Sequence, residues 1–120
     1  MAESDDPDYW AGKVSPSRYL SDWRAFAESL DDYPGNIDDY THDMLMRDSL
    51  VKIIERAKPA DQTVIQDELD EIDAIFTSRT IDDEGYAVGH YSRRPSDPGA
   101  GWWWKRRPPS GRLGEYLDHP

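Results

Sequence analysis

The strongest constraint on the fold is a helical spacing of large apolar residues that occurs twice along the chain. The first set, spaced by four, three and four residues, is Tyr19, Trp23, Phe26 and Leu30. The second set, with the same spacing, is Ile65, Leu69, Ile72 and Phe76. Residues at such intervals share one face of an α-helix, which turns once in about 3.6 residues. The spacing therefore predicts two amphipathic helices.

Capping residues set the limits of these helices. Ser15 is a favoured N-cap and Pro16 suits the first helical position, so the first helix is expected at about residues 16–32. Asp61 offers an N-cap for the later helix, which is expected to run to about residue 79. Between them, apolar side chains cover nearly half of a helical circumference, which predicts a central helix at residues 37–57.

The chain changes character after Ile81. Six of its eight glycines and five of its nine prolines lie beyond residue 84, and no helical spacing of useful length continues there. A short strand at Tyr86 to Tyr91 and a last turn at Arg112 to Leu117 are compatible with this composition. The C-terminal part is therefore expected to be largely irregular.

Together these signals predict a mainly α fold in three parts. Short connections favour an antiparallel bundle of three helices at residues 15–82. An acidic, flexible segment at residues 1–14 precedes the bundle, and Tyr9 and Trp10 are expected to anchor it on the helices. An irregular, basic, Trp-rich arm at residues 83–120 is expected to pack on the bundle.

Charge is divided unevenly along the 120 residues, which carry a net charge of -11 at pH 7. Residues 85–120 contain three acidic and six basic residues, so the acidic excess lies in the preceding part. A strongly acidic body repels nucleic-acid phosphates and anionic lipids, and it attracts cationic partners. We therefore expect a basic protein partner, no direct binding of nucleic acid and no binding to membranes.

Several classes of protein are excluded or disfavoured by composition. The absence of cysteine excludes disulfides, thiolate zinc sites and cysteine nucleophiles. No apolar run approaches the roughly 20 residues of a membrane span, and the acidic first nine residues are unlike a signal peptide. We expect a cytoplasmic protein without a cofactor, and the oligomeric state stays open.

The third predicted helix carries many acids and no lysine or arginine between Pro59 and Ser78. Like charges three or four residues apart in mid-helix repel each other, so this arrangement suggests a use beyond folding. The candidate partner-binding residues on this helix are Asp67, Asp70, Glu71 and Asp73. A face that is only solvated, or one covered by the basic arm, is the alternative interpretation.

A second candidate surface is a run of aromatic and basic residues in the arm. Trp and Arg dominate the energetics of protein interfaces, because they offer large contact area and several donors. The candidate residues are Trp102, Trp103, Trp104 and Arg106. Docking of one or two of these tryptophans on the chain's own helices is the alternative, and stacking of nucleic-acid bases is disfavoured by the net charge.

The central helix contains one charge inside its apolar stripe, Arg47, which must be paired if it is buried. Asp43 lies four residues earlier, which predicts a structural ion pair between the two. Asp39, His42 and Asp43 also share a face at metal-ligand spacing. Because neither neighbouring helix contains a histidine, we predict no metal site.

The stretch from Asp39 to Asp43, continued by Arg47 to Leu50, resembles a group of small actinobacterial proteins of uncharacterised function. Tyr19, Leu20 and Trp23 before it and the tryptophan run after it share in this resemblance. The resemblance extends over most of the chain and implies one compact domain. It carries no catalytic residue onto this sequence.

No catalytic constellation is present. The chain has no arrangement of serine, histidine and acid that suggests a triad, and no glycine-rich phosphate loop. We therefore predict a non-enzymatic, acidic binding protein that neutralises a basic protein, as a toxin-immunity protein or an antitoxin does. Two alternatives stay open: an accessory or structural subunit that docks through its C-terminal arm, and a metal-dependent enzyme centred on His42.

Overall fold

The computed structural model describes residues 15–118, and most of them are helical. The expected N-terminal segment, with Tyr9 and Trp10, lies outside the described residues. The helices are α2 (Pro16–Glu28), α3 (Ile37–Arg56), α4 (Pro59–Ser78), α5 (Tyr86–Gly89) and α6 (Gly111–Asp118). Short 3-10 turns are η1 (Leu30–Asp32), η2 (Arg94–Ser96) and η3 (Trp102–Lys105). Two strands, β1 (Ile81–Asp82) and β2 (Arg106–Arg107), pair antiparallel.

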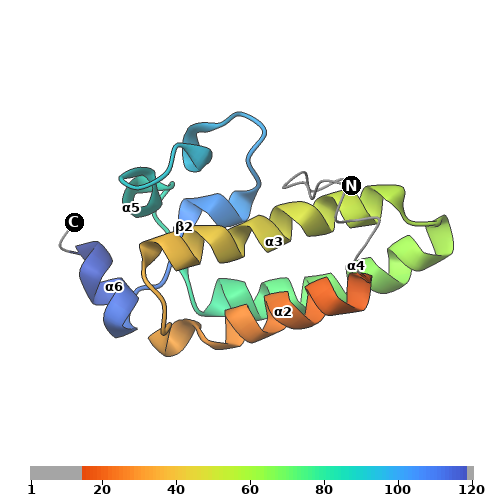
Figure 1. The fold of residues 1–120 in the computed structure, drawn as a ribbon, viewed down its shortest axis with the longest axis horizontal. Helices are drawn as coiled ribbons and strands as arrows, with labels where there is room; N and C mark the ends of the chain where they lie inside the picture. Colours follow the sequence, from red (N-terminus) through yellow and green to blue (C-terminus); the bar gives the residue numbers. More distant parts are fainter. Residues whose placement is uncertain (1–14, 119–120) are drawn as a thin grey trace, which may run out of the picture.

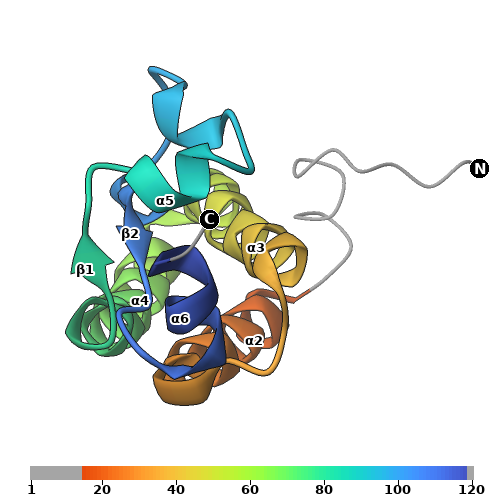
Figure 2. The ribbon, with the colours of Figure 1, turned by 90° about the vertical axis from the view of Figure 1, so that its left-hand side faces the viewer.

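The three long helices lie side by side and form the body of the molecule (Figure 1). Helix α2 packs against both α3 and α4. The chain after α4 returns across one end of these helices, and α6 contacts the η1 turn that follows α2 (Figure 2). The pairing of β1 with β2 brings the segment after α4 beside the segment after η3. The arm is therefore an integral part of the fold.

Local signals explain where the helices start. The Ser15 hydroxyl accepts a hydrogen bond from the Arg18 backbone N–H at 3.4 Å, and Pro16 occupies the first turn, as predicted. At α3, Asn36 and Asp39 form a reciprocal capping box, with bonds of 2.9 and 3.0 Å. Helix α4 starts at Pro59 instead of the expected Asp61, because proline is favoured at a first helical position.

The mainly helical prediction is confirmed, but the number of helices and one local assignment differ. Residues 86–91, expected as a strand, contain helix α5. Gly85 has φ +83°, and the Asp83 carboxylate accepts bonds of 3.0 Å from the backbone N–H groups of Gly85 and Ala87. This cap starts a helical turn where the apolar composition had favoured a strand. Helix α6 likewise extends the expected last turn.

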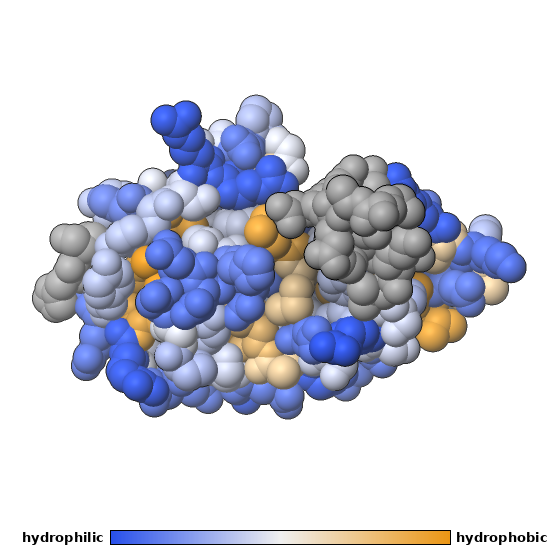
Figure 3. Space-filling model, in the orientation of Figure 1, coloured by the Kyte–Doolittle hydropathy of each residue, from blue (hydrophilic) through white to orange (hydrophobic). Residues whose placement is uncertain are grey.

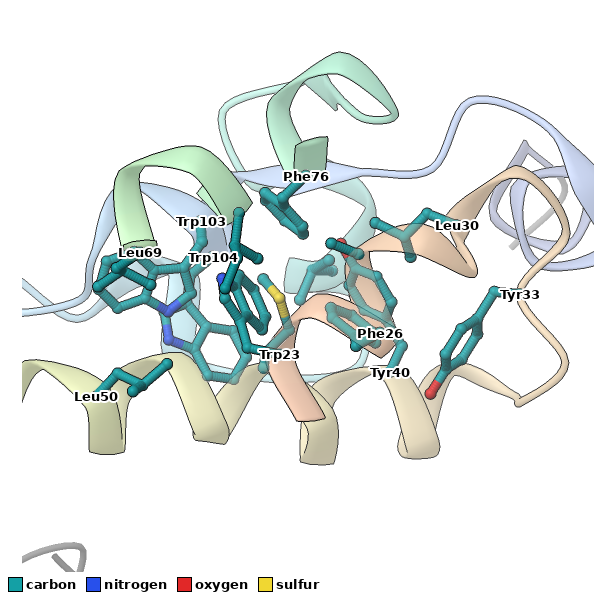
Figure 4. Packing of buried hydrophobic residues seen from close by; sticks show 14 of the residues in the cluster. Trp23, Phe26, Leu30, Tyr33, Tyr40, Leu50, Leu69, Phe76, Trp103 and Trp104 are labelled. Atoms are coloured by element: carbon teal, nitrogen blue, oxygen red, sulfur yellow. The ribbon is translucent and has the colours of Figure 1, made fainter. Parts of the chain in front are cut away.

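One hydrophobic core contains residues from the long helices and from the arm (Figure 4). Trp23, Phe26 and Phe76 lie in mutual ring contact, with centroids 5.1–6.2 Å apart. The arm contributes Trp103, Trp104, Leu113 and Leu117. The arm therefore contributes to the same core as the long helices, and its removal would expose apolar side chains of these helices.

The face of the molecule drawn in Figure 3 is mainly hydrophilic, with small apolar patches between polar side chains. No helix within residues 15–118 combines the length and the apolar character needed to cross a membrane. Among the large apolar side chains that stay exposed are Leu45, Val64, Tyr86, Trp102 and Tyr116. These isolated residues are the places where a partner could gain apolar contact.

Candidate interaction surface

The predicted buried charge, Arg47, is paired with a different carboxylate from the one expected. Arg47 Nε donates to Asp73 Oδ1 at 3.0 Å, and Arg47 Nη2 donates to Asp73 Oδ2 at 2.9 Å. The Arg47 guanidinium also lies 4.2 Å from the centre of the Trp103 ring. Asp43, the predicted partner, instead accepts a hydrogen bond from the Tyr33 hydroxyl. The prediction of an Asp43–Arg47 pair is therefore wrong.

Asp73 connects all three long helices. Its Oδ1 accepts a second hydrogen bond from Trp23 Nε1 of α2 at 3.0 Å, in addition to the bond from Arg47 of α3. Its side chain is only 13% exposed. Asp73 was predicted to bind a partner, but its carboxylate is occupied by groups of the chain itself. Its role in this structure is to hold the helices together.

A second carboxylate with little exposure, that of Asp48 of α3, attaches the arm. Its Oδ1 accepts hydrogen bonds from Trp103 Nε1 at 3.0 Å and from Trp104 Nε1 at 2.9 Å. Its Oδ2 accepts from Arg94 Nη2 at 3.0 Å. Nothing near Asp48 in the sequence indicates this role, because the donors lie 46 to 56 positions away along the chain. A buried indole N–H needs a hydrogen-bond acceptor, and this general requirement is the only indication that the tryptophans of the arm would bind a carboxylate such as Asp48.

Trp103 and Trp104 are therefore buried, which matches the alternative that some tryptophans dock on the helices. Trp102 differs from them: it is 43% exposed, and its ring centre lies 5.9 Å from that of Phe76 in α4. Of the three predicted tryptophan contacts, only Trp102 offers substantial surface to a partner. It lies against the C-terminal part of α4.

Two further cations of the arm, Arg106 and Arg107, also bind within the chain. Arg106 donates to the Thr80 hydroxyl at 2.8 Å and to the Thr80 carbonyl at 2.9 Å, although it was predicted to contact a partner. Arg107 Nη2 donates to the Gly114 carbonyl at 2.9 Å and lies 2.8 Å from Asp118 Oδ1. These contacts join the strand β2 to Thr80, which follows α4, and to α6. They leave Arg93, Lys105 and Arg112 as the exposed cations of the described arm.

Two tyrosines add hydrogen bonds between segments. Burial, together with the bond to Asp43, raises the pKa of Tyr33. Burial raises the pKa of Tyr40 as well, and its hydroxyl donates to the Arg106 carbonyl at 3.0 Å. Both phenols therefore stay neutral and can donate throughout the physiological pH range.

The other acids predicted on α4 do lie at the surface. Asp67, Asp70 and Glu71 are exposed, and we call them the α4 carboxylates. Asp70 accepts a hydrogen bond from the neutral amide of Gln66 at 2.7 Å. Within the described part of the chain, an ion pair forms only at Glu71, whose Oε2 lies 3.8 Å from Arg24 Nη2. The α4 carboxylates therefore keep most of their negative charge available to a partner.

The predicted metal-ligand spacing on α3 does not develop into a cluster. Among residues 15–118, no three histidine, cysteine, aspartate or glutamate side chains are grouped so that they could hold a metal ion. His42 is exposed at the surface of α3, and Asp39 is engaged in the capping box. Asp43 is engaged by Tyr33.

Comparisons with known proteins do not indicate a function, so a functional proposal rests on the geometry of the described residues. Searches against protein-family models, curated proteins and solved structures found no match.

Proposed function

We propose that this protein is a small acidic binding protein that recognises a basic protein through the α4 carboxylates, with Trp102 as an apolar anchor. A protein of this kind could neutralise a cationic active site, as an immunity protein or an antitoxin does. The proposal takes the three long helices as an antiparallel bundle that holds the carboxylates at fixed spacing. It assigns no catalytic role to the chain.

The observation that carries the proposal is the charge of α4. This helix has 20 residues and contains no lysine or arginine, and its exposed acids lie where like charges repel each other. The nearby basic arm could have neutralised them. Arg94, Arg106 and Arg107 instead bind groups on α3, after α4 and on α6. The exposed acids are thus left for solvent or for a partner.

The apolar part of such an interface would come from Trp102. Trp103 and Trp104 cannot serve without leaving the core, because their indole N–H groups are bound to Asp48. Trp102 is exposed and packs against α4, the helix that carries the acids. Tryptophan is among the residue types that are enriched at interface hot spots.

An electrostatic interface of this kind has a kinetic signature. Exposed charges steer a partner of opposite charge and accelerate association, and salt screens them over about 8–10 Å at physiological ionic strength. Association should therefore slow steeply as salt is added. Dissociation should depend mainly on Trp102, because apolar contacts are little affected by moderate salt.

The test is affinity capture from a lysate of the source cell, followed by binding measurements on the captured protein. The variant Asp67→Lys, Asp70→Lys, Glu71→Lys should lose a basic protein that the wild type retains. The matched control, Glu28→Lys, Glu55→Lys, Glu115→Lys, changes the net charge equally at other exposed positions. If both variants lost the captured protein equally, net charge alone, and not the position of the α4 carboxylates, would explain the binding. Retention by the α4 variant would contradict the proposed site.

A second candidate function, an accessory subunit that docks through its arm, is supported by the exposure of Trp102 and Lys105. The two functions separate in one comparison. Trp102→Ser should abolish docking of an accessory subunit, while charge reversal on α4 should leave it intact. A basic partner should respond to both changes. Deletion of the arm is not a suitable test, because the arm contributes to the core.

A further inference from the structure

A hollow of about 480 Å³ lies beside the start of α2, at the end of the molecule where α3 turns into α4. Its apolar lining comes from Pro16, Ile53, Ala57, Val64 and Ile65. Val64 is 69% exposed, an unusual exposure for a large aliphatic side chain next to the core. Apolar surface is visible at this end of the molecule (Figure 3). We call this hollow the Val64 groove.

We propose that the Val64 groove is the docking site of the chain's own N-terminal segment, residues 1–14, with Trp10 as the anchor. This inference does not rest on the proposed function, because the α4 carboxylates do not line the groove. It assigns a partner of known sequence to an apolar surface that is otherwise open to solvent.

The position of the groove along the chain favours this occupant. The described residues begin at Ser15, and the next two residues, Pro16 and Ser17, line the groove. The five Cα-to-Cα steps from Trp10 to Ser15 can span at most about 18 Å when extended. Trp10 can therefore reach the groove without any rearrangement of α2. Linkage in one chain also raises the effective concentration of the segment at the groove.

Charge favours the same occupant. Residues 1–14 contain four acids, Glu3, Asp5, Asp6 and Asp8, and one basic side chain, Lys13, so the segment is acidic, most strongly in the part before Tyr9. The lining of the Val64 groove includes two basic residues, Arg56 and Lys58, and one acid, Asp61. Opposite charges of this kind select one docking surface among several that are similarly apolar.

A second apolar hollow, between α2 and α3, provides the contrast. Three carboxylates line it, from Asp22, Asp39 and Asp43, and none of the described residues in its lining is basic. An acidic segment would be repelled there. Its apolar lining includes Phe26 and Met46, so apolar character alone does not separate the two sites. The charge of the lining does separate them, and it favours the Val64 groove for an acidic segment.

The absence of cysteine from the chain permits a direct test by disulfide trapping. Ala11→Cys, next to the proposed anchor, is combined with Val64→Cys, and the full-length protein is oxidised at low concentration. The matched control combines Ala11→Cys with Ser21→Cys, an exposed position near the start of α2 that does not line the groove. The intramolecular disulfide should form faster with position 64 than with position 21. Mass spectrometry measures both rates.

A second change separates docking from mere tethering. Trp10→Ala in the 11–64 pair should slow trapping about tenfold, because it removes the burial of a large aromatic side chain. Lys58→Glu should slow it as well, whereas Lys52→Glu, the same charge change outside the groove, should not. Equal trapping at positions 64 and 21, trapping unaffected by Trp10→Ala, or disulfides between molecules only would each overturn the proposal.

A cysteine-free measurement covers the case in which the paired variants fail to fold. Trp10→Ala alone should lower the urea midpoint of unfolding, and the same change should have little effect in a Val64→Asp background. Such coupling is expected only if the two side chains interact. Additive effects of Trp10→Ala and Val64→Asp would count against docking in this groove.

Discussion

Arg47 of α3 and Asp73 of α4 form a two-bond ion pair within the helical body, at 3.0 and 2.9 Å, beside the ring of Trp103. The Arg47 residue is only 6% exposed, so its charge depends on this partner. The planar guanidinium fits a carboxylate in one orientation, which fixes how α3 lies along α4. Trp23 adds a bond from α2 to the same carboxylate. A single acid therefore sets the relative positions of three helices.

Removal of this acid should destabilise the protein strongly. Asp73→Ala leaves the Arg47 charge buried and unpaired, and we expect the free energy of unfolding to fall by about 3–5 kcal/mol. Asp67→Ala, at an exposed position on the same helix, should change it by no more than about 0.5 kcal/mol. Urea unfolding followed by circular dichroism measures both. A double variant, Arg47→Met with Asp73→Leu, should recover part of the loss, because it removes both charges but still leaves the Trp23 indole N–H without its acceptor. A double variant as unstable as Asp73→Ala would show that the pairing is not the cause.

The helical part of the fold could be predicted because its signal is local. Apolar residues at helical intervals recur in α2 and α4, and the caps at Ser15 and Pro16 lie where the sequence places them. The partner of Arg47 could not be predicted in this way. Asp43 has the correct spacing within α3, but Tyr33 occupies it, and Asp73 comes from another helix. The choice between two carboxylates depends on tertiary packing.

The arm was harder to predict for the same reason. Its composition indicated irregular structure, and its three tryptophans could equally have faced a partner or the core. Their separation depends on the η3 turn and on one acceptor in α3, Asp48, which is far away in sequence. Of the candidate site, the exposed α4 carboxylates could be read from the sequence. The engagement of Asp73, Trp103 and Trp104 by other groups of the chain could not be predicted from the sequence.

Asp48 is expected to control attachment of the arm. Asp48→Ala leaves the indole N–H groups of Trp103 and Trp104 and one Arg94 donor without their acceptor, at about 1–3 kcal/mol for each buried group left unsatisfied. Trypsin should then cleave the arm faster, and tryptophan fluorescence should shift to longer wavelength. Glu55→Ala, at an exposed position on the same helix, is the control. An arm that stays as resistant as in the wild type would show that apolar packing alone holds it.

Alkaline pH should weaken the fold through Tyr33. Burial and the Asp43 carboxylate raise the pKa of this phenol in the folded protein, so the unfolded chain loses the proton at lower pH. The contribution to stability is therefore complete below the ordinary tyrosine pKa of about 10 and is lost as the pH rises above it. Tyr33→Phe should make the free energy of unfolding fall less steeply with pH above that value. Tyr86→Phe, at a side chain that is 71% exposed, is the control. Identical pH profiles for wild type and Tyr33→Phe would contradict this assignment.

Attachment of α6 depends on a glycine at its first residue. Gly111 has φ +75°, and a Cβ atom there would lie 2.8 Å from the Asp31 carbonyl oxygen and 2.9 Å from the Asp32 Cα. Both neighbours are backbone atoms, so they cannot move aside as a flexible side chain would. Gly111→Ala therefore combines a strained backbone with a steric clash, and we expect a loss of more than about 1 kcal/mol in the free energy of unfolding.

Gly99→Ala is the matched control, because a Cβ atom at that position meets nothing within 4 Å. Thermal unfolding of the two variants compares them directly, and Gly99→Ala should be nearly neutral. Hydrogen exchange adds a local measurement: in Gly111→Ala, the amides around Leu113 and Leu117 should lose protection before those of α2, because these leucines dock α6 into the shared core. Equal melting temperatures for both variants would mean that α6 adapts its contact with the η1 turn, and that the left-handed residue is not required there.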